Sequence, residues 1–142
     1  MTVKLQQTTI RAFIALLPIA GLVACGANQT EKYLEGGITP DQAIIAAAAE
    51  GDTGALKAFL DDGVPVEAQK PDGTTPLMAA AEKGKHDAVK LLIERGADVR
   101  FAKPDGWTAV IAAAQSGQAD VTRALLEAGA DPSAATRDGF TA

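Results

Sequence analysis

Residues that could perform chemistry are few in this chain of 142 residues. It contains one cysteine (Cys25), one histidine (His86) and two serines (Ser116 and Ser133). A His/Cys metal site or a nucleophilic triad needs several such groups held together. His86 has no second histidine beside it and is interpreted as an ordinary surface residue. These counts predict no catalytic residue, no metal site and no cofactor.

Two further patterns of reactive groups have simpler interpretations. Asp61 and Asp62 are adjacent carboxylates, as in acid–base catalysis, but they precede Gly63 at an expected helix end, where a solvated turn is expected. No glycine-rich turn is followed by the Gly-Lys-Ser/Thr of a phosphate-binding loop. The chain has 18 Asp and Glu against 13 Lys and Arg, a net charge of -5. This acidity predicts that the protein does not bind nucleic acid.

Cys25 stands at the end of a segment with the layout of an export signal. Lys4 and Arg11 precede an uncharged, apolar run over residues 12–27. This run is shorter than the roughly 20 residues that span a bilayer as a helix. It ends in Leu22-Val23-Ala24-Cys25, which resembles the lipobox of bacterial lipoproteins. The resemblance implies cleavage before Cys25 and lipidation of its thiol.

The predicted lipoprotein is attached to a membrane without being embedded in it. Residues 1–24 are the predicted signal peptide, and residues 25–37 are the lipidated Cys and a flexible tether, in which residues 30–35 are compatible with a helical turn. Because anionic lipids repel an acidic protein, the acyl chains must supply the attachment. Gly26, rather than Asp, resembles the sorting signal for the outer membrane in Gram-negative lipoproteins. The alternative is a cytosolic protein whose apolar N-terminus is wrongly assigned.

From residue 38 onward the sequence repeats with a period of 33. Asp-Gly recurs at 72–73, 105–106 and 138–139, and Ala-Ala-Ala recurs at 46–48, 79–81 and 112–114. Each unit predicts two short helices: in the first unit, one begins after the capping Thr39 and ends near Gly51, and another ends near Asp61. Turns between units hold Pro, Asp and Gly and are expected to project as hairpins. One unit cannot bury its own apolar stripe, so the units must stack.

These residues carry a resemblance to a known family. Asp72-Gly73-Thr74-Thr75-Pro76-Leu77 and the segment Leu91 to Val99, with its counterparts in the next unit, are similar to the pattern of ankyrin repeats. The resemblance implies an all-α solenoid with hairpin-like connections, in units of about 38–69, 70–102, 103–135 and the start of a fourth at 136–142. The histidine usual in the family is replaced by apolar Ile45, Met78 and Ile111.

The resemblance also implies a protein-binding surface made by the turns and the first helices. Mapped by the register, the predicted binding residues are Thr74, Glu82, Lys83, Asp105, Trp107, Gln115, Ser116, Arg137, Asp138 and Phe140, flanked by Pro71, Asp72, Ala102 and Pro104. Trp107 and Phe140 occupy equivalent positions, outside the apolar stripe that stacking buries, and are expected to anchor a partner. The alternative is that Trp107 packs locally on a neighbouring turn.

The sequence therefore predicts a monomeric, non-enzymatic ankyrin lipoprotein of the bacterial envelope, facing the periplasm and binding another protein. An exported enzyme, or a toxin that the array neutralises, is the expected kind of partner. The alternative is an enzyme or enzyme subunit whose active residues lie beyond Ala142. The chain ends at the start of a fourth unit, so a truncated array with an uncovered third helix pair is expected.

Overall fold

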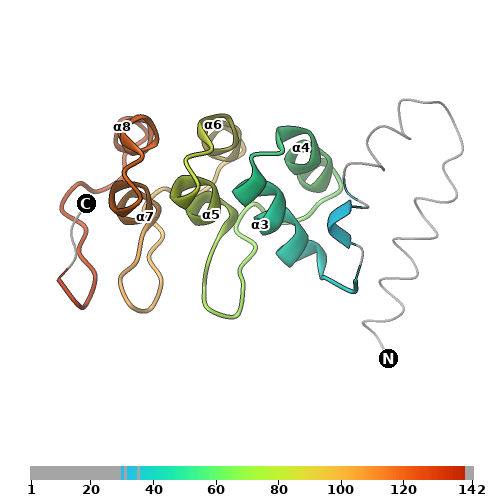
Figure 1. The fold of residues 1–142 in the computed structure, drawn as a ribbon, viewed down its shortest axis with the longest axis horizontal. Helices are drawn as coiled ribbons and strands as arrows, with labels where there is room; N and C mark the ends of the chain where they lie inside the picture. The colour runs from blue at the N-terminus through green and yellow to red at the C-terminus, as the bar shows by residue number, and fades with distance from the viewer. Residues whose placement is uncertain (1–29, 31, 35, 140–142) are drawn as a thin grey trace, which may run out of the picture.

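Six helices stack as three pairs in the computed structural model, which describes residues 30, 32–34 and 36–139 of the chain. The helices are α3 (Pro40–Glu50), α4 (Thr53–Asp61), α5 (Pro76–Glu82), α6 (His86–Glu94), α7 (Ala109–Gln115) and α8 (Ala119–Glu127). The first helices of the pairs (α3, α5, α7) pack side by side in one layer, and the second helices (α4, α6, α8) form the other (Figure 1). Within the described residues there is no strand beyond a single bridge between Ala102 and Thr108. The predicted all-α repeat fold is confirmed.

Threonine caps decide where the first helices begin. The Thr75 and Thr108 hydroxyls accept the backbone N–H of Met78 and Ile111, each at 3.3 Å, in the geometry of a helix N-cap. Thr39 caps α3 in the same way, but it stands three residues earlier in the 33-residue register than Thr75. As a result, α3 has an extra turn where the later units have a hairpin, and the Thr-Pro start signal of the first unit is shifted relative to that of the second.

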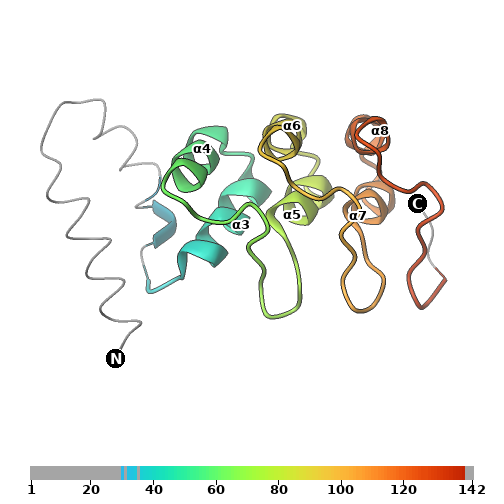
Figure 2. The same ribbon diagram turned by 180° about the vertical axis from the view of Figure 1, so that it is seen from behind.

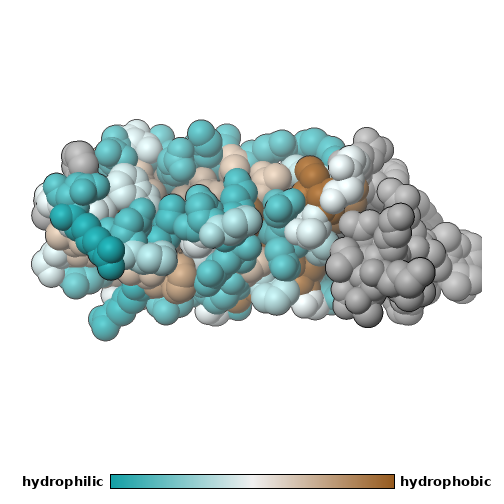
Figure 3. Space-filling view, turned by 90° about the horizontal axis from the view of Figure 1, so that it is seen from below, coloured by the Kyte–Doolittle hydropathy of each residue, from teal (hydrophilic) through white to brown (hydrophobic). Residues whose placement is uncertain are grey.

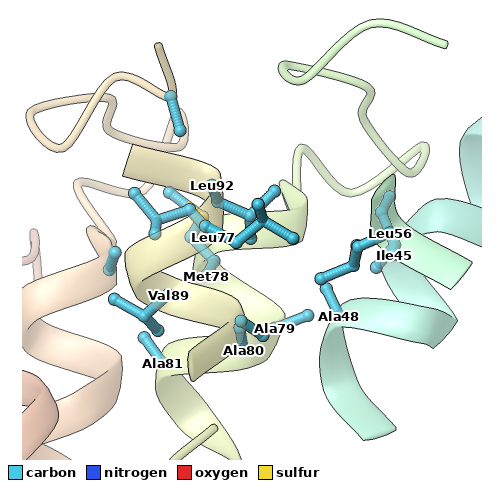
Figure 4. Close-up of a cluster of buried hydrophobic side chains, with 14 of the residues drawn as sticks. Ile45, Ala48, Leu56, Leu77, Met78, Ala79, Ala80, Ala81, Val89 and Leu92 are labelled. Carbon is cyan, nitrogen blue, oxygen red and sulfur yellow. The ribbon is translucent and has the colours of Figure 1, made fainter. Parts of the chain in front are cut away.

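The core between the units is built mainly from small side chains. Ala47, Ala80 and Ala113 are equivalent residues of the three first helices, and all are fully buried. Because alanine adds little bulk, these helices can pack closely. Larger residues such as Leu92 fill the space between the two layers, each contributing about 1.5–3 kcal/mol by its burial. Figure 4 shows part of this cluster across the first and second units.

Hairpins project from the same edge of the array after each second helix (Figures 1 and 2). They close through backbone hydrogen bonds from Lys70 N–H to Thr74 and from Lys103 N–H to Trp107, at 3.0 and 2.8 Å. The third unit's hairpin also bonds to the next one, since Arg137 N–H donates to the carbonyl of Asp105 at 3.0 Å. The predicted hairpins are confirmed. In addition, this hydrogen bond joins one hairpin directly to the next.

The N-terminal end of the array begins earlier than the sequence indicated. Tyr33, placed by sequence in a flexible tether, is only 4% exposed and packs edge-on against Phe59, with ring centroids 6.3 Å apart. Its hydroxyl donates to Glu50 at 2.8 Å, and Lys32 forms an ion pair with Glu50 at 2.6 Å. The predicted tether is therefore corrected: residues 30 and 32–34 are helical, as the alternative of a helical turn allowed, and belong to the folded array. Cys25 and the predicted signal peptide lie outside the described residues.

The C-terminal end is more polar than the interior. Leu126 of α8 is 38% exposed, whereas its equivalents Leu60 and Ile93 are partly buried. Thr122 stands where the inner units carry the fully buried Leu56 and Val89. The residues after α8 nevertheless pack back: Ala130 and Thr136 are 5% and 8% exposed. The expectation that nothing covers the third helix pair is thus wrong in part.

Candidate binding groove between the second and third units

A hollow of about 310 Å³ lies between the hairpins and first helices of the second and third units. We call it the groove. Its lining residues are Asp72, Thr74, Met78 and Glu82 from the second unit, and Lys103, Trp107, Ala112, Gln115 and Ser116 from the third. The surface on the side from which the hairpins project is largely hydrophilic, with apolar patches between polar atoms (Figure 3).

The groove is lined mainly by polar groups, with Trp107 as its one large apolar side chain that is partly exposed. Met78 and Ala112 also border it, but they are only 3% and 2% exposed and offer almost no surface of their own. Glu82, Gln115 and Ser116 are exposed at or near the ends of the same helices. A partly exposed aromatic ring surrounded by polar groups is common in protein-binding surfaces.

Asp72 is the most constrained charged group of the groove. Its carboxylate accepts the Thr74 hydroxyl at 2.7 Å and the Thr74 backbone N–H at 3.1 Å, and Lys103 Nζ lies 3.5 Å away. The hydrogen bonds from Thr74, with a smaller contribution from Lys103, lower the pKa of Asp72. Asp72 is therefore an anion at neutral pH, held in one orientation.

Trp107 contributes to the groove and to the core at once. Its side chain is partly buried and packs against the hydrophobic cluster, while another part lines the groove. Its backbone N–H donates to Asp105 Oδ1 at 3.0 Å, which fixes the end of the hairpin. The expectation that this position lies outside the packed residues is therefore wrong, although the position does face the groove.

Half of the ten predicted binding residues meet in the groove, namely Thr74, Glu82, Trp107, Gln115 and Ser116. Lys83, Asp105, Arg137 and Asp138 are exposed but do not line it, and Phe140 lies outside the described residues. Three groove residues were not predicted: Met78, Lys103 and Ala112. The apolar residue at 78, where the family usually has histidine, was a visible signal for Met78. The sequence carried no signal for Lys103. Its equivalent in the preceding unit, Lys70, is also a lysine, so the repeat does not distinguish this position.

A second, polar hollow of about 420 Å³ lies between α6 and α8, lined by His86, Asp120, Arg123, Ala124 and Glu127. His86 Nδ1 is 3.8 Å from its neighbour Asp87 and is exposed. Asp61, interpreted from sequence as part of a solvated turn, is exposed and pairs with Arg95 of the next unit at 2.9 Å. In the described part of the chain, no group of three His, Cys, Asp or Glu residues is arranged to hold a metal. None of the described helices is long and apolar enough to cross a membrane.

Three stacked helix pairs with projecting hairpins define a helical-repeat solenoid. The family model described as Ankyrin repeats (3 copies) matches residues 43–136, so the chain belongs to the ankyrin-repeat family. No curated protein matches its sequence. Ankyrin repeats are scaffolds for protein–protein interaction, and this class fits a groove built from two adjacent units.

Proposed function

We propose that this protein is an exported bacterial lipoprotein that presents its ankyrin array, as a monomer, to another protein in the cell envelope. Acyl chains on Cys25 anchor it, with its array in the periplasm and the outer membrane as its location. The support for export is the sequence of the N-terminal segment, which ends in Leu22-Val23-Ala24-Cys25. The observation that carries the binding role is the groove, where two units bring five predicted binding residues together.

The groove favours a protein partner because it combines the features that concentrate binding energy. Trp107 offers an aromatic surface that is already held by the core, so little conformational entropy is lost when it binds. Gln115 and Ser116, both exposed, supply hydrogen-bonding groups at the rim. An exported enzyme or a toxin would each present the protruding side chains that such a groove accepts.

Site-specific photocrosslinking in cells tests the binding role. A photoreactive residue at Gln115, on the rim of the groove, is expected to capture one protein reproducibly from the membrane fraction. The matched control carries the same residue at Lys57, which is exposed on α4 in the other layer. Equal capture from both positions, or capture only from Lys57, would contradict the assignment of the groove.

Fractionation tests the anchor separately. Cys25→Ala is expected to move the protein from the membrane pellet to the soluble fraction, because the acidic array has no attraction of its own for anionic lipids. The control is Ser116→Ala, which alters the groove but not the lipobox. A Cys25→Ala variant that still pellets after a salt wash would remove the anchor assignment and leave the groove unaffected.

A further inference from the structure

We infer that the groove receives an arginine side chain of the partner, so that the recognised chemistry is a guanidinium group on a protruding loop. This inference rests on the proposed function, since it concerns what the groove binds. It follows from the placement of Trp107, Asp72 and Glu82 around one hollow.

The shape and lining of the groove suit a long side chain with a charged end. The partly exposed ring of Trp107 provides apolar surface along which methylene groups can lie. Tryptophan is also the aromatic residue that attracts cations most strongly over its face. A planar guanidinium can stack on an indole and still donate hydrogen bonds at its edge, which the compact ammonium of lysine does less well.

The charges of the groove leave room for one more cation. Two carboxylates line it, those of Asp72 and Glu82, against the single ammonium of Lys103. Lys103 is directed to Asp72, and its side chain is only 16% exposed. The negative charge of Glu82 is therefore not balanced by any cation that lines the groove. Lys83 lies 3.6 Å from Glu82, but both side chains are more than half exposed, and such pairs are weak in water.

The wider electrostatics act in the same direction. Residues 38–139 contain sixteen Asp and Glu against ten Lys and Arg. A net negative array attracts positively charged loops and repels acidic ones before contact is made. The competing interpretation is that Lys103 captures a carboxylate of the partner. It is disfavoured because Lys103 already has Asp72 as its partner and is mostly buried.

Titration with small peptides tests this inference without knowledge of the partner. Trp107 is the only tryptophan of the chain, so a change in the intrinsic fluorescence of the full protein in non-ionic detergent arises at this residue of the groove. The peptides are acetyl-Gly-Arg-Gly-amide, its citrulline analogue, which has the same shape without the charge, and the glutamate analogue. We expect the arginine peptide to bind at least about fivefold more tightly than the citrulline peptide, as a cation over an aromatic face implies.

Variants of the groove then identify the groups responsible. Glu82→Gln is expected to remove most of the preference for arginine, whereas Glu94→Gln, the loss of an exposed carboxylate on α6, leaves it unchanged. Lys103→Gln is expected to strengthen arginine binding, because it removes a competing cation from Asp72. Melting curves of each variant establish that the array is still folded.

Equal affinity for the arginine and citrulline peptides would overturn the inference, as would tighter binding of the glutamate peptide or a loss of arginine binding in Lys103→Gln. These outcomes are distinct from failure of the proposed function. If a partner crosslinks at Gln115 but the arginine preference is missing, the groove remains the binding site and the proposed recognition of a guanidinium is wrong. If arginine is preferred but no partner is crosslinked, the groove still recognises a guanidinium and the proposed role in binding a protein in the cell is wrong.

Discussion

The two ends of the array are closed in different ways. At the N-terminal end, Tyr33 comes from outside the repeat, packs on Phe59 and bonds through its hydroxyl to Glu50. At the other end, Thr122 replaces the apolar residue of the inner units and Leu126 is left 38% exposed. Since each unit contacts only its neighbours, the ends decide where the stack opens first. The comparison therefore predicts that the N-terminal end opens less readily than the C-terminal end.

The largest effect is expected in the middle of the stack. Leu92→Ala should lower the free energy of unfolding by about 3 kcal/mol, because it empties a fully buried position with a neighbouring unit on each side. Leu125→Ala removes the equally buried equivalent in α8 and should cost about half as much, because we expect α8, with a neighbouring helix pair on one side only, to open locally before the rest of the stack. Urea denaturation followed by circular dichroism measures both. Equal losses would mean that the C-terminal end is as firm as the centre.

The N-terminal closure is tested by two substitutions of one residue. Tyr33→Ala should lower the free energy of unfolding by about 2 kcal/mol, since a ring that is 4% exposed is lost. Tyr33→Phe keeps the contact with Phe59 and loses the hydrogen bond to Glu50, at a cost of about 1 kcal/mol. The same urea denaturation compares them. If Tyr33→Ala were neutral, residues 30 and 32–34 would belong to the tether after all.

How much of this comparison could be predicted from the sequence depends on the repeat. The helices and the glycines after them recur every 33 residues, so the period locates them; among the threonine caps, Thr75 and Thr108 follow the period, while Thr39 stands three residues earlier. Tyr33 lies outside the period, in a polar segment, and nothing local indicates that its ring is buried. The groove was half predictable for the same reason: the register identifies which side faces out, but contacts such as Lys103 with Asp72 depend on how two hairpins approach each other.

The C-terminal end can be made to resemble the interior. A polar capping repeat fused after Ala142 should raise the free energy of unfolding by about 1–2 kcal/mol, because it covers the exposed Leu126 and gives α8 a second neighbour. The melting temperature and the hydrogen exchange of α8 amides measure the change. The matched control is a tail of the same composition in scrambled order, which should have no effect. A cap without effect would show that this end is already satisfied.

Trp107 is expected to matter more for partner binding than for stability. Trp107→Ala should lower the free energy of unfolding by about 1 kcal/mol, because part of the ring packs against the core, and weaken partner binding by well over tenfold. Ser116→Ala, at the exposed rim of the same groove, is the control for a small change in polarity. Binding is measured well below the melting temperature, so that unfolding does not contribute. Unchanged affinity would make Trp107 purely structural.

The smallest expected effect is a loss of stability at alkaline pH. It arises at the N-terminal end only, from ionisation of the Tyr33 hydroxyl. Burial, followed by the hydrogen bond to Glu50, raises the pKa of Tyr33 from 10.0 to about 12. The folded protein therefore holds the phenol proton more tightly than the unfolded chain does. This stabilisation is complete below pH 10 and is lost as the pH rises through about 12.

Tyr33 is the only tyrosine, so tyrosinate absorbance follows its titration directly. The hydrogen bonds of Lys32 to Glu50 and Tyr33 raise the pKa of that ammonium and contribute in the same direction, so the decisive comparison is with Tyr33→Phe. That variant should lose less stability than the wild type between these pH values, and the loss should begin at the N-terminal end, with α8 exchange unchanged. Identical pH profiles for both proteins would mean that the Tyr33 hydroxyl does not close the array.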